Sequence, residues 1–485
     1  MFDIPCSDLI EWGVGPFTEG KELSVKIVIV GNGKVGFTLA EQLVKENHDI
    51  TIVDTNEQAL RRGTDVLDIM AVKGNGVSGS VLREAGAENA DLLVAVTNMD
   101  EVNMICCLTA RKLGVKYTIA RIRNPEYNSA LEELKRDLGI HMTINPEYST
   151  AIEISRLLRF PSATNIETFC RGRVELMGFR LQPDDFMVGK PLKNLSGQVK
   201  KLSILFCAVD RNGEVMIPNG AFVPQADDKV YMIGRPTGLT QFFRLLGRHA
   251  PKVNRVLIVG GGKISAYLAA LLLKMKMQVK LIEYNEKRCR QLSEDYPDMT
   301  VICGDGSDQE VLESENLNAF DAFVALTGRD EDNMIVSLYA AQQGISKVVT
   351  KSNRQNYAGI ARAVGLDSVI SPKVITAAHI LKVVRGMENS QGSVMNALYR
   401  IADGAAEAME FSVTKSTRNL GIPLKDLKLK PGILLAVVVR GNEIIIPEGS
   451  TYTKDGDSVI VISKSPIQDI NDIYEDSFVP GGGKV

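Results

Sequence analysis

The sequence is short of paired cysteines. Its 485 residues include seven cysteines, an odd number, and no C-x-x-C motif. Disulfide frameworks and zinc sites place cysteines in pairs at short, regular spacings. We therefore predict reduced thiols, with neither a disulfide framework nor a zinc site.

Long apolar runs and an excess of one charge are also missing. The nearest approach to the roughly 18–20 apolar residues of a membrane helix, segment 266–282, is interrupted by Lys274 and Lys276. The chain has 56 Lys and Arg against 59 Asp and Glu, a formal net charge of −3. Nucleic-acid-binding proteins carry a basic patch or stripe. We therefore expect no membrane span and no nucleic-acid partner.

The first 24 residues lack the pattern of a signal peptide, because acidic residues, glycine and proline interrupt any apolar core. We expect residues 1–24 to be a poorly ordered extension, and we hypothesise that Val25 is the native first residue. Mass spectrometry of the native N-terminus would test this.

What the chain does contain is a long internal repeat. Gly31 corresponds to Gly260 and Asp54 to Glu283, an offset of 229 residues in each case. Segment 90–110 resembles segment 320–340, and segment 214–234 resembles segment 443–463. The chain is therefore a tandem duplication, and a repeat of this kind decides the architecture.

The first part of each unit alternates short apolar runs with helical patterns. Such runs are typical of strands buried on both faces of a parallel sheet, and the helical spacers indicate βαβ crossovers. The runs are KIVIV, DITIVD, IMAVKG, DLLVAVT, YTIARI and HMTI in the first unit, and RVLIV, QVKLIE, TVICGD, DAFVALT, KVVTK and SVI in the second. Asn145–Pro146 and Ser371–Pro372 then predict a helix start, with an N-cap followed by proline.

The second part of each unit has short alternating strands and hairpin turns at DRNGE and RGNE. We therefore predict an α/β protein with two doubly wound parallel-sheet Rossmann domains, each followed by a small α+β domain. The predicted domains are residues 25–145, 165–250, 253–371 and 395–475. Segments 159–169, 388–397 and 247–254 are the predicted linkers.

A glycine-rich loop follows the first strand of each unit. In the first unit Gly31, Gly33 and Gly36 follow a strand and open a helix, which is the arrangement of a dinucleotide-binding loop. The candidate contacts are Gly31, Asn32, Gly33, Lys34, Val35 and Gly36, with Asp54 at the end of the next strand as the ribose-binding carboxylate. A carboxylate there accepts from a ribose 2′-OH and repels a 2′-phosphate, so NAD or ATP fits better than NADP.

The second loop departs from this pattern. Ser265 replaces the third glycine and Glu283 replaces the aspartate. Its candidate contacts are Gly260, Gly261, Gly262, Lys263, Ile264, Ser265 and Glu283. Serine is small, so we expect only mild strain in the helix packing, and the ligand of this site can differ from that of the first.

Further candidates lie where other strands end, because ligands of open parallel sheets bind at the carboxyl ends of the strands. They are Gly74, Asn75, Thr97, Asn98 and Arg121 in the first unit, and Gly304, Asp305, Thr327, Gly328 and Lys351 in the second. Thr and Asn also cap helices, and Arg121 can instead be solvated. The acidic residues Asp100, Glu101 and 330–332 are sufficiently explained by the helix dipole.

Catalytic signatures are missing as well. The four histidines, His48, His141, His249 and His379, are expected to be structural, and no G-x-S-x-G, H-E-x-x-H or Walker A motif occurs. A dehydrogenase would also need a substrate domain and a placed base. We therefore expect binding without catalysis.

The first unit contains KIVIVGNGKVG, ITIVD, VLREAGAENADLLVAVTNMDEVNM and IARIR, and each duplicated unit ends in a small β module. With these features, residues 25–465 resemble the regulatory subunits of Trk potassium uptake systems. This tandem RCK (regulator of K⁺ conductance) family implies a Rossmann RCK_N part and an RCK_C part in each unit. It implies NAD(H) in the first unit, and NAD(H) or ATP/ADP in the second. It further implies a homo-oligomeric, tetrameric ring in the cytoplasm, on the inner face of the cell membrane, bound to a potassium-translocating membrane subunit.

Two alternatives remain at this point. One is an NAD-dependent oxidoreductase with two nucleotide domains, and the other is an interaction scaffold with vestigial sites. Sequence alone does not choose among NADH, NAD⁺, ATP and ADP, or identify the coupling ion of the transporter.

Overall fold

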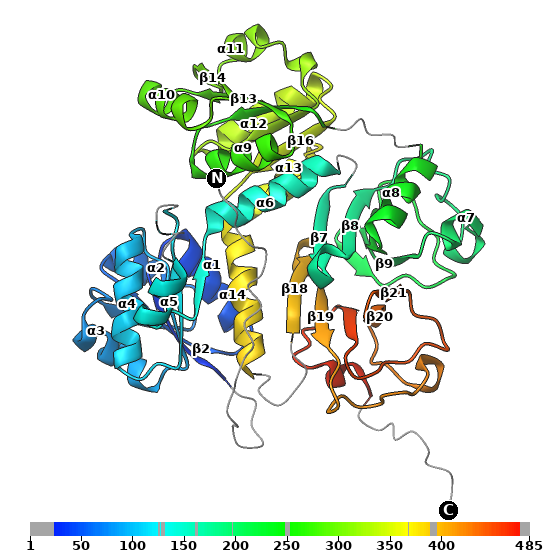
Figure 1. Ribbon diagram of the computed structural model, residues 1–485, viewed down its shortest axis with the longest axis horizontal. Helices are drawn as coiled ribbons and strands as arrows, with labels where there is room; N and C mark the ends of the chain where they lie inside the picture. Colours follow the sequence, from blue (N-terminus) through cyan, green and yellow to red (C-terminus); the bar gives the residue numbers. More distant parts are fainter. Residues whose placement is uncertain are drawn as a thin grey trace, which may run out of the picture.

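The computed structural model describes residues 24–124, 127, 131–160, 163–195, 197–247, 253–366, 368–388 and 395–475. The expected extension, apart from residue 24, lies outside these residues, as do positions 248–252 of the predicted linker, with His249. Figure 1 shows three lobes around two central helices. Two lobes are parallel sheets, and the third is a pair of smaller sheets.

The first lobe is a six-stranded parallel sheet with the strand order β3-β2-β1-β4-β5-β6, a doubly wound order. Its strands are β1 (Lys26–Val30), β2 (Asp49–Asp54), β3 (Met70–Lys73), β4 (Leu92–Ala95), β5 (Tyr117–Arg121) and β6 (Met142–Ile144). Its helices are α1 (Lys34–Val44), α2 (Glu57–Thr64), α3 (Gly79–Glu84), α4 (Asp100–Lys112) and α5 (Leu131–Leu138).

The second lobe repeats the first with the order β14-β13-β12-β15-β16-β17. Its strands are β12 (Arg255–Val259), β13 (Gln278–Glu283), β14 (Thr300–Cys303), β15 (Ala322–Ala325), β16 (Lys347–Lys351) and β17 (Val369–Ile370). Its helices are α9 (Lys263–Lys274), α10 (Glu286–Asp295), α11 (Gln309–Ser314), α12 (Asp330–Gln342) and α13 (Gln355–Ala363). Every strand predicted for the two sheets is present.

Two five-stranded antiparallel sheets make the third lobe, with equivalent orders β10-β9-β11-β8-β7 and β18-β19-β22-β20-β21. The first has β7 (Asn165–Phe169), β8 (Val174–Arg180), β9 (Ile204–Arg211), β10 (Glu214–Met216), β11 (Lys229–Gly234), α7 (Gly197–Lys200) and α8 (Pro236–Leu245). The second has β18 (Met395–Ile401), β19 (Ala406–Ser412), β20 (Ile433–Arg440), β21 (Glu443–Ile445) and β22 (Ser458–Ser463). The predicted α/β architecture is confirmed, and both predicted hairpin turns join paired strands.

Part of the linker prediction is wrong. Residues 165–169 form the edge strand β7, and residues 395–397 begin the edge strand β18. An edge strand pairs through its backbone on one side only, so a short segment with polar side chains can add to a sheet there.

The two small sheets pack face to face and share one apolar core. Hydrogen bonds also join them. Tyr231 Oη accepts from the Ala402 backbone N–H at 3.0 Å, and Tyr399 Oη donates to the Thr168 carbonyl at 2.9 Å. The small domains of the two units therefore form one body.

The central helices α6 (Pro146–Arg159) and α14 (Pro372–Glu388) are exchanged between the units (Figure 1). Helix α6 follows the first parallel sheet but packs on α9 of the second, whereas α14 follows the second sheet and packs on α1 of the first. Leu157 and Leu158 thus share a core with Leu268 and Leu272. Each half of the molecule is built from parts of both units.

The start of α6 is as predicted, with Asn145 Oδ1 accepting from Tyr148 N at 3.0 Å and Pro146 in the first turn. For α14 the capping prediction is wrong in detail, because Ser371 Oγ is buried without a hydrogen-bond partner among the described residues. The Ser371 carbonyl still accepts the first helical N–H bonds.

A buried ion-pair network ties α14 to its neighbours. Arg385 is 1% exposed and donates to both carboxylate oxygens of Glu46, at 2.9 and 2.6 Å. It also donates to Glu407 of β19 at 2.7 and 3.0 Å. The two carboxylates raise the pKa of Arg385 although burial opposes this. Arg400 completes the network at 3.1 Å from Glu46.

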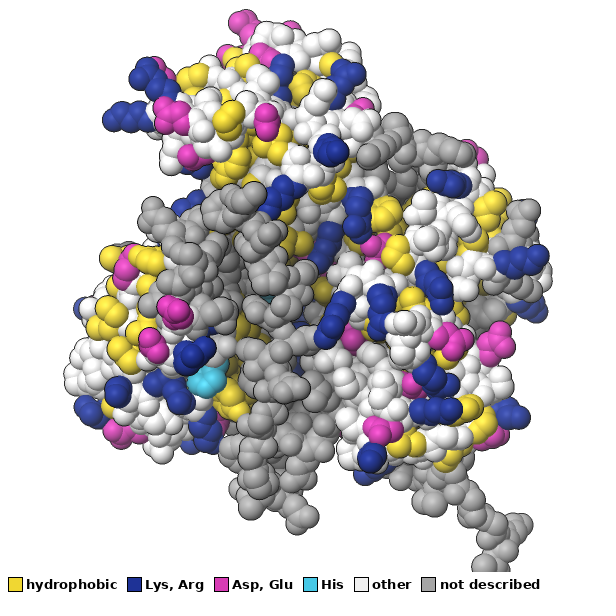
Figure 2. Space-filling view, in the orientation of Figure 1, with side chains coloured by type: hydrophobic (Ala, Val, Ile, Leu, Met, Phe, Trp, Pro, Cys, Tyr) yellow, Lys and Arg dark blue, Asp and Glu magenta, His cyan; other side chains and the backbone are white. Residues whose placement is uncertain are grey.

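No helix in the described ranges is long and apolar enough to cross a membrane. Figure 2 shows Lys and Arg side chains interspersed with Asp and Glu over the visible faces of the lobes.

Replacing Arg385 by alanine is expected to lower the free energy of unfolding by about 3–5 kcal/mol, because the buried Glu407 and the partly buried Glu46 lose their main partner. Among the described residues, these carboxylates then keep only Arg400. The matched control is Arg61→Ala, which removes an exposed pair with Glu57 and should change stability by less than about 0.5 kcal/mol. Urea unfolding measures both. Equal effects of the two variants would contradict a central role for this network.

Candidate functional site

The two glycine loops have the same backbone geometry. Gly31 and Gly260 have φ of 104° and 97°, which favours glycine, and their backbone N–H groups donate to the carbonyls of Val53 and Ile282, each at 2.8 Å. Gly33 and Gly262 are the N-caps of α1 and α9, and neither helix has a side-chain cap. The first N–H groups of both helices are therefore open to an anion.

In each loop, the glycine at the second glycine position of the motif, Gly33 or Gly262, faces open space. A Cβ atom added at Gly33 or at Gly262 would meet nothing within 4 Å. At Gly36 an added Cβ would lie 1.9 Å from the Gly31 carbonyl oxygen. Gly36 is therefore needed for packing, whereas Gly33 and Gly262 leave room for an approaching group.

Ser265 shows how the second unit accommodates a side chain at the third glycine position. Its side chain is buried, and its Oγ donates to the Gly260 carbonyl at 2.5 Å. In the first unit the Gly31 carbonyl would clash with a Cβ at position 36. Its counterpart in the second unit, the Gly260 carbonyl, accepts a hydrogen bond from Ser265.

The acidic residues predicted to contact a ribose also hold the loops in place. Asp54 accepts from the Asn32 N–H at 2.6 Å and from the Asn56 N–H at 2.8 Å. Glu283 accepts from Gly261 N at 2.6 Å and from Asn285 N at 2.8 Å. A carboxylate oxygen can accept more than one hydrogen bond, so both residues can serve a ribose as well. Removing either would disturb the loop together with the ligand contact.

The residue after the first glycine differs between the two loops, and a different hydrogen bond fixes each loop at this position. Asn32 donates from Nδ2 to the Ala59 carbonyl of α2 at 2.7 Å. Gly261 replaces Asn32, and a Cβ there would approach Leu292 to 2.8 Å. Arg288 of α10 instead donates from Nε to the Gly261 carbonyl at 2.8 Å. Each loop is thus linked to the following helix by its own hydrogen bond.

Thr97 and Thr327 are held by buried asparagines that the sequence analysis missed. Asn103 Oδ1 accepts from Thr97 N at 2.9 Å and from Thr97 Oγ1 at 2.7 Å, and its Nδ2 donates to the Arg121 carbonyl at 2.9 Å. Asn333 makes the same contacts with Thr327 and Lys351. Both asparagines are 0% exposed. Their repetition in DEVNM and DEDNM was the available signal.

The helix-dipole explanation of the acidic run is incomplete. Asp100 is buried and accepts from the Arg123 and Asn124 N–H groups at 2.7 and 2.8 Å. Asp330 likewise accepts from Asn353 and Arg354 at 2.8 and 3.0 Å. These carboxylates fix the loops that follow β5 and β16.

The remaining candidates lie in turns. Asn75 Oδ1 accepts from Val77 N at 3.1 Å, next to Gly74. Hydrogen bonds from Ser307 to Asp305, which follows Gly304, lower the pKa of that carboxyl. The Asn98 carbonyl accepts from Arg123, and a Cβ at Gly328 would meet nothing within 4 Å.

Arg121, a candidate phosphate contact, forms an ion pair in this structure. Its Nη2 lies 2.8 Å from Glu147 Oε1 at the start of α6, and the side chains are 11% and 16% exposed. Arg121 Nε and Glu147 Oε2 have no hydrogen-bond partner among the described residues. The pair therefore keeps unused donor and acceptor capacity at the carboxyl end of β5, on the same edge of the parallel sheet as the first loop.

The two sites approach one another across the junction of the units. Lys351 of the second unit donates to the Leu326 carbonyl at 3.3 Å. Its pKa is lowered, first by burial and also by Lys34, whereas Asp330 and Glu147 oppose the shift. Lys34 and Glu147 belong to the first unit, so charges of both sites act on Lys351.

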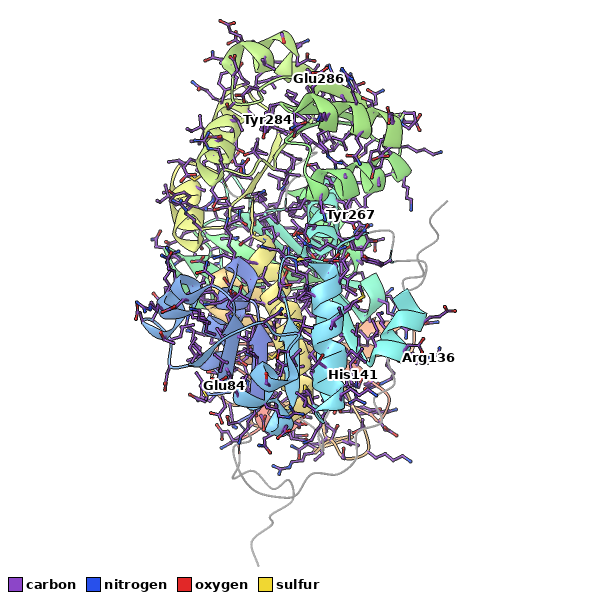
Figure 3. All side chains as sticks on the ribbon, turned by 90° about the vertical axis from the view of Figure 1, so that its left-hand side faces the viewer. Glu84, Arg136, His141, Tyr267, Tyr284 and Glu286 are labelled. Carbon is purple, nitrogen blue, oxygen red and sulfur yellow. The ribbon has the colours of Figure 1, made fainter. Side chains whose placement is uncertain are left out.

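Tyr267 of α9 bridges this junction directly. Its hydroxyl donates to the Arg123 carbonyl at 2.9 Å and accepts from Asn145 Nδ2 at 3.1 Å. Figure 3 shows it between the two parallel-sheet lobes. The first helix of the second site therefore contacts the loop after β5 in the first.

The chemistry of the sites favours binding of a phosphate-containing ligand. Among the described residues, no group of three or more His, Cys, Asp and Glu could hold a metal ion. The described histidines are away from the carboxyl strand ends, since His48 and His141 precede β2 and β6 and His379 is on α14. The open helix N-termini can bind phosphates, and one carboxylate in each site, Asp54 or Glu283, can bind a ribose. Both sites therefore fit a nucleotide.

The packing role of Gly36 can be separated from the open position of Gly33. Gly36→Ala should destabilise the protein by about 1–3 kcal/mol through overpacking. Gly33→Ala, at φ −76°, should change stability by less than about 0.5 kcal/mol. Thermal unfolding without ligand measures this, and equal Tm values for both alanine variants would contradict it.

Two protein-family models match the same four parts of the chain that the fold shows, two parallel-sheet domains and two small domains. Residues 27–146 and 256–372 match the TrkA-N domain, and residues 176–247 and 408–474 match the TrkA-C domain. The chain is 35% identical over 460 residues to the Trk system potassium uptake protein TrkA of Vibrio alginolyticus, covering 93% of this chain and 99% of the relative. It is 36% identical over 458 residues to TrkA of Halomonas elongata, with the same coverage of 93% and 99%.

An archaeal relative and two solved structures extend the comparison. TrkA homolog 2 of Methanosarcina mazei is 33% identical over 449 residues, covering 91% of this chain and 98% of the relative. The GsuK channel has the same fold at 19% identity and a TM-score of 0.61, with 92% of this chain and 78% of that chain covered. The GsuK RCK domain gives 18% identity and a TM-score of 0.60, with 92% and 93% covered.

The three relatives are named as potassium uptake proteins, in agreement with the expectation that this chain is not an enzyme. The domain matches cover more than half of the chain, and they confirm the resemblance drawn from its motifs. The chain belongs to the TrkA family, the tandem-RCK regulatory subunits of Trk potassium uptake systems.

Proposed function

We propose that this protein senses nucleotides at its two glycine loops and thereby regulates potassium flux through a membrane Trk subunit. The first loop binds NAD(H), and the second binds NAD(H) or ATP/ADP. The observation that carries the proposal is the open space at Gly33 and Gly262, in front of uncapped helix N-termini, in a protein of a potassium uptake family.

Several features support NAD(H) for the first loop. Asp54 stands where a ribose carboxylate is expected, and its charge disfavours a 2′-phosphate. One of the solved structures with this fold, at 19% identity and a TM-score of 0.60, is described as the GsuK channel bound to NAD. We also propose the domain limits 25–145, 165–250, 253–371 and 395–475 as the functional parts.

The partners follow from the family. We propose that the chain assembles into a homo-oligomeric ring, a tetramer, on the cytoplasmic face of the membrane, where it contacts the potassium-translocating subunit. The formal net charge of −3 gives no support to a nucleic-acid partner.

In this proposal, the Arg121–Glu147 ion pair links nucleotide binding at the first loop to the conformation of the protein. A nucleotide phosphate near the first loop would compete with Glu147 for Arg121, because guanidinium groups bind phosphates well. Glu147 begins α6, which packs on α9 of the second unit. Release of Glu147 would therefore change the contact between the two parallel-sheet domains.

Titration calorimetry on the full chain tests the two sites separately. Gly33→Ala should lower affinity at the first site at least tenfold, because the new methyl group occupies the phosphate position, and should leave the second site unchanged. Gly262→Ala should do the reverse. NADH, NAD⁺, ATP, ADP and NADPH are compared, and absence of binding by the wild-type chain would refute the sensor proposal.

Glu147→Gln should strengthen nucleotide binding at the first site about three- to tenfold, because the competing carboxylate is gone. The control is Glu153→Gln, which alters an ion pair with Arg156 further along α6 and should leave affinity unchanged. Calorimetry measures affinity, and potassium uptake with the partner subunit reports coupling. Weaker binding by Glu147→Gln would contradict the competition.

A further inference from the structure

Two of the scattered cysteines meet behind the second glycine loop. Cys303 is exposed at the end of β14, and Cys289 is buried on α10. Cys289 Sγ donates to the Glu283 carbonyl at 3.1 Å, and the same carbonyl accepts at 2.9 Å from the N–H of Gly304, the residue after Cys303. Cys303 is close enough to contribute to the raised pKa of Cys289. Figure 3 labels Tyr284 and Glu286, which lie between Glu283 and the body of α10.

The same cluster is tied to the nucleotide carboxylate. Glu283 and Cys303 are Cα partners in the pairing of β13 with β14. Glu283 in turn holds the glycine loop through Gly261 N. The thiol pair thus contacts the residue on which the geometry of the second loop depends.

The first unit has no such pair. Leu60 on α2 occupies the position of Cys289, and Lys73 pairs with Asp54 as Cys303 pairs with Glu283. Any chemistry of the thiol pair is therefore confined to the second unit, and the first site serves as an internal control.

We propose that Cys289 and Cys303 form a reversible disulfide on exposure to a peroxide, and that this disulfide weakens nucleotide binding at the second site. The second half of this statement rests on the proposed function. Disulfides of reducing compartments are usually transient and serve catalysis or redox sensing, which fits a pair beside a ligand site.

The reaction balances with hydrogen peroxide as the oxidant. The Cys303 sulfur attacks one peroxide oxygen, the O–O bond breaks, and Cys303 sulfenic acid and one water form. The Cys289 sulfur then attacks the sulfenic sulfur, the S–S bond forms, and the S–O bond breaks to release a second water. Two thiols lose two electrons and two protons, and the peroxide is reduced to two waters.

Cys303 reacts first because its thiol is exposed. Cys289 is buried, and burial with a contribution from Cys303 raises its pKa to about 11, so it is not the thiol that meets the peroxide and is left for the second step. The disulfide takes Cys289 Sγ away from the Glu283 carbonyl and ties α10 to β14. Either change displaces Glu283 from the position in which it holds Gly261.

The first experiment asks whether the bond forms. The full chain, freed of reductant, is treated with hydrogen peroxide, alkylated, digested and analysed by mass spectrometry. We expect a cross-linked peptide pair containing Cys289 and Cys303, lost in Cys303→Ser and reversed by dithiothreitol. Cys106, Cys107, Cys170 and Cys207 are buried and should remain alkylatable after denaturation. Absence of the cross-link, or a cross-link that joins Cys289 to a different cysteine of the wild-type chain, overturns the proposal.

The second experiment measures nucleotide binding before and after oxidation. In the Gly33→Ala background, which reports the second site, oxidation should weaken binding about five- to tenfold, and dithiothreitol should restore it. In the Gly262→Ala background, which reports the first site, oxidation should have no effect. A cross-linked protein with unchanged second-site affinity overturns the redox inference alone. Lack of binding to the reduced wild-type chain refutes the proposed function, and the mass spectrum still decides whether the disulfide forms.

Discussion

The exchange of α6 and α14 between the two units is the constraint on which the rest of the structure depends. Each helix leaves its own parallel sheet and buries its apolar face on the first helix of the other unit. Each fully buried Leu or Ile contributes about 1.5–3 kcal/mol, so neither domain can leave the other without exposing a large apolar surface. A tandem duplication has thus become one cooperative body with two approximately equivalent halves.

The two halves are not identical, and their differences are compensated locally. Arg385 is neutralised by Glu46 and Glu407 in one half. In the other half Met275 replaces Glu46, and Arg159, whose side chain is 49% exposed, keeps among the described residues only the pair with Glu175, the counterpart of Glu407, at 2.7 Å. Ser265 and Arg288 similarly restore hydrogen bonds to a second loop whose glycines differ from those of the first. The scaffold is therefore maintained where the ligand contacts have diverged.

Much of the fold could be predicted because its signals are local. Short apolar runs mark strands buried on both faces, and their repetition predicts two equal sheets. The exchange of α6 and α14 could not be predicted, because an apolar helix face shows that a residue is buried but not which element covers it. The partial assignment of β7 and β18 to linkers has a different cause, because these edge strands carry polar side chains among their apolar ones.

The candidate sites show a similar division. Spacing placed Gly31, Gly33 and Asp54 at one sheet edge, but it gave no information on how their polar atoms are already used. Backbone N–H groups occupy both oxygens of Asp54, and Glu147 occupies Arg121. These contacts depend on segments far apart in sequence, and a ligand must share or displace them.

The contacts that a nucleotide must share or displace also limit how far it can shift the conformation of the protein. A ligand shifts a conformational equilibrium only by its differential affinity for the two shapes, and a change from 1:99 to 99:1 requires about 5.5 kcal/mol. Exchanging one partly buried ion pair for a phosphate contact supplies only a fraction of this, so several sites must act together. Four sites would each need about 1.4 kcal/mol, or tenfold in affinity. In the proposed mechanism, duplication supplies additional sites, and the exchanged helices, which connect the two loops within one chain, would couple them.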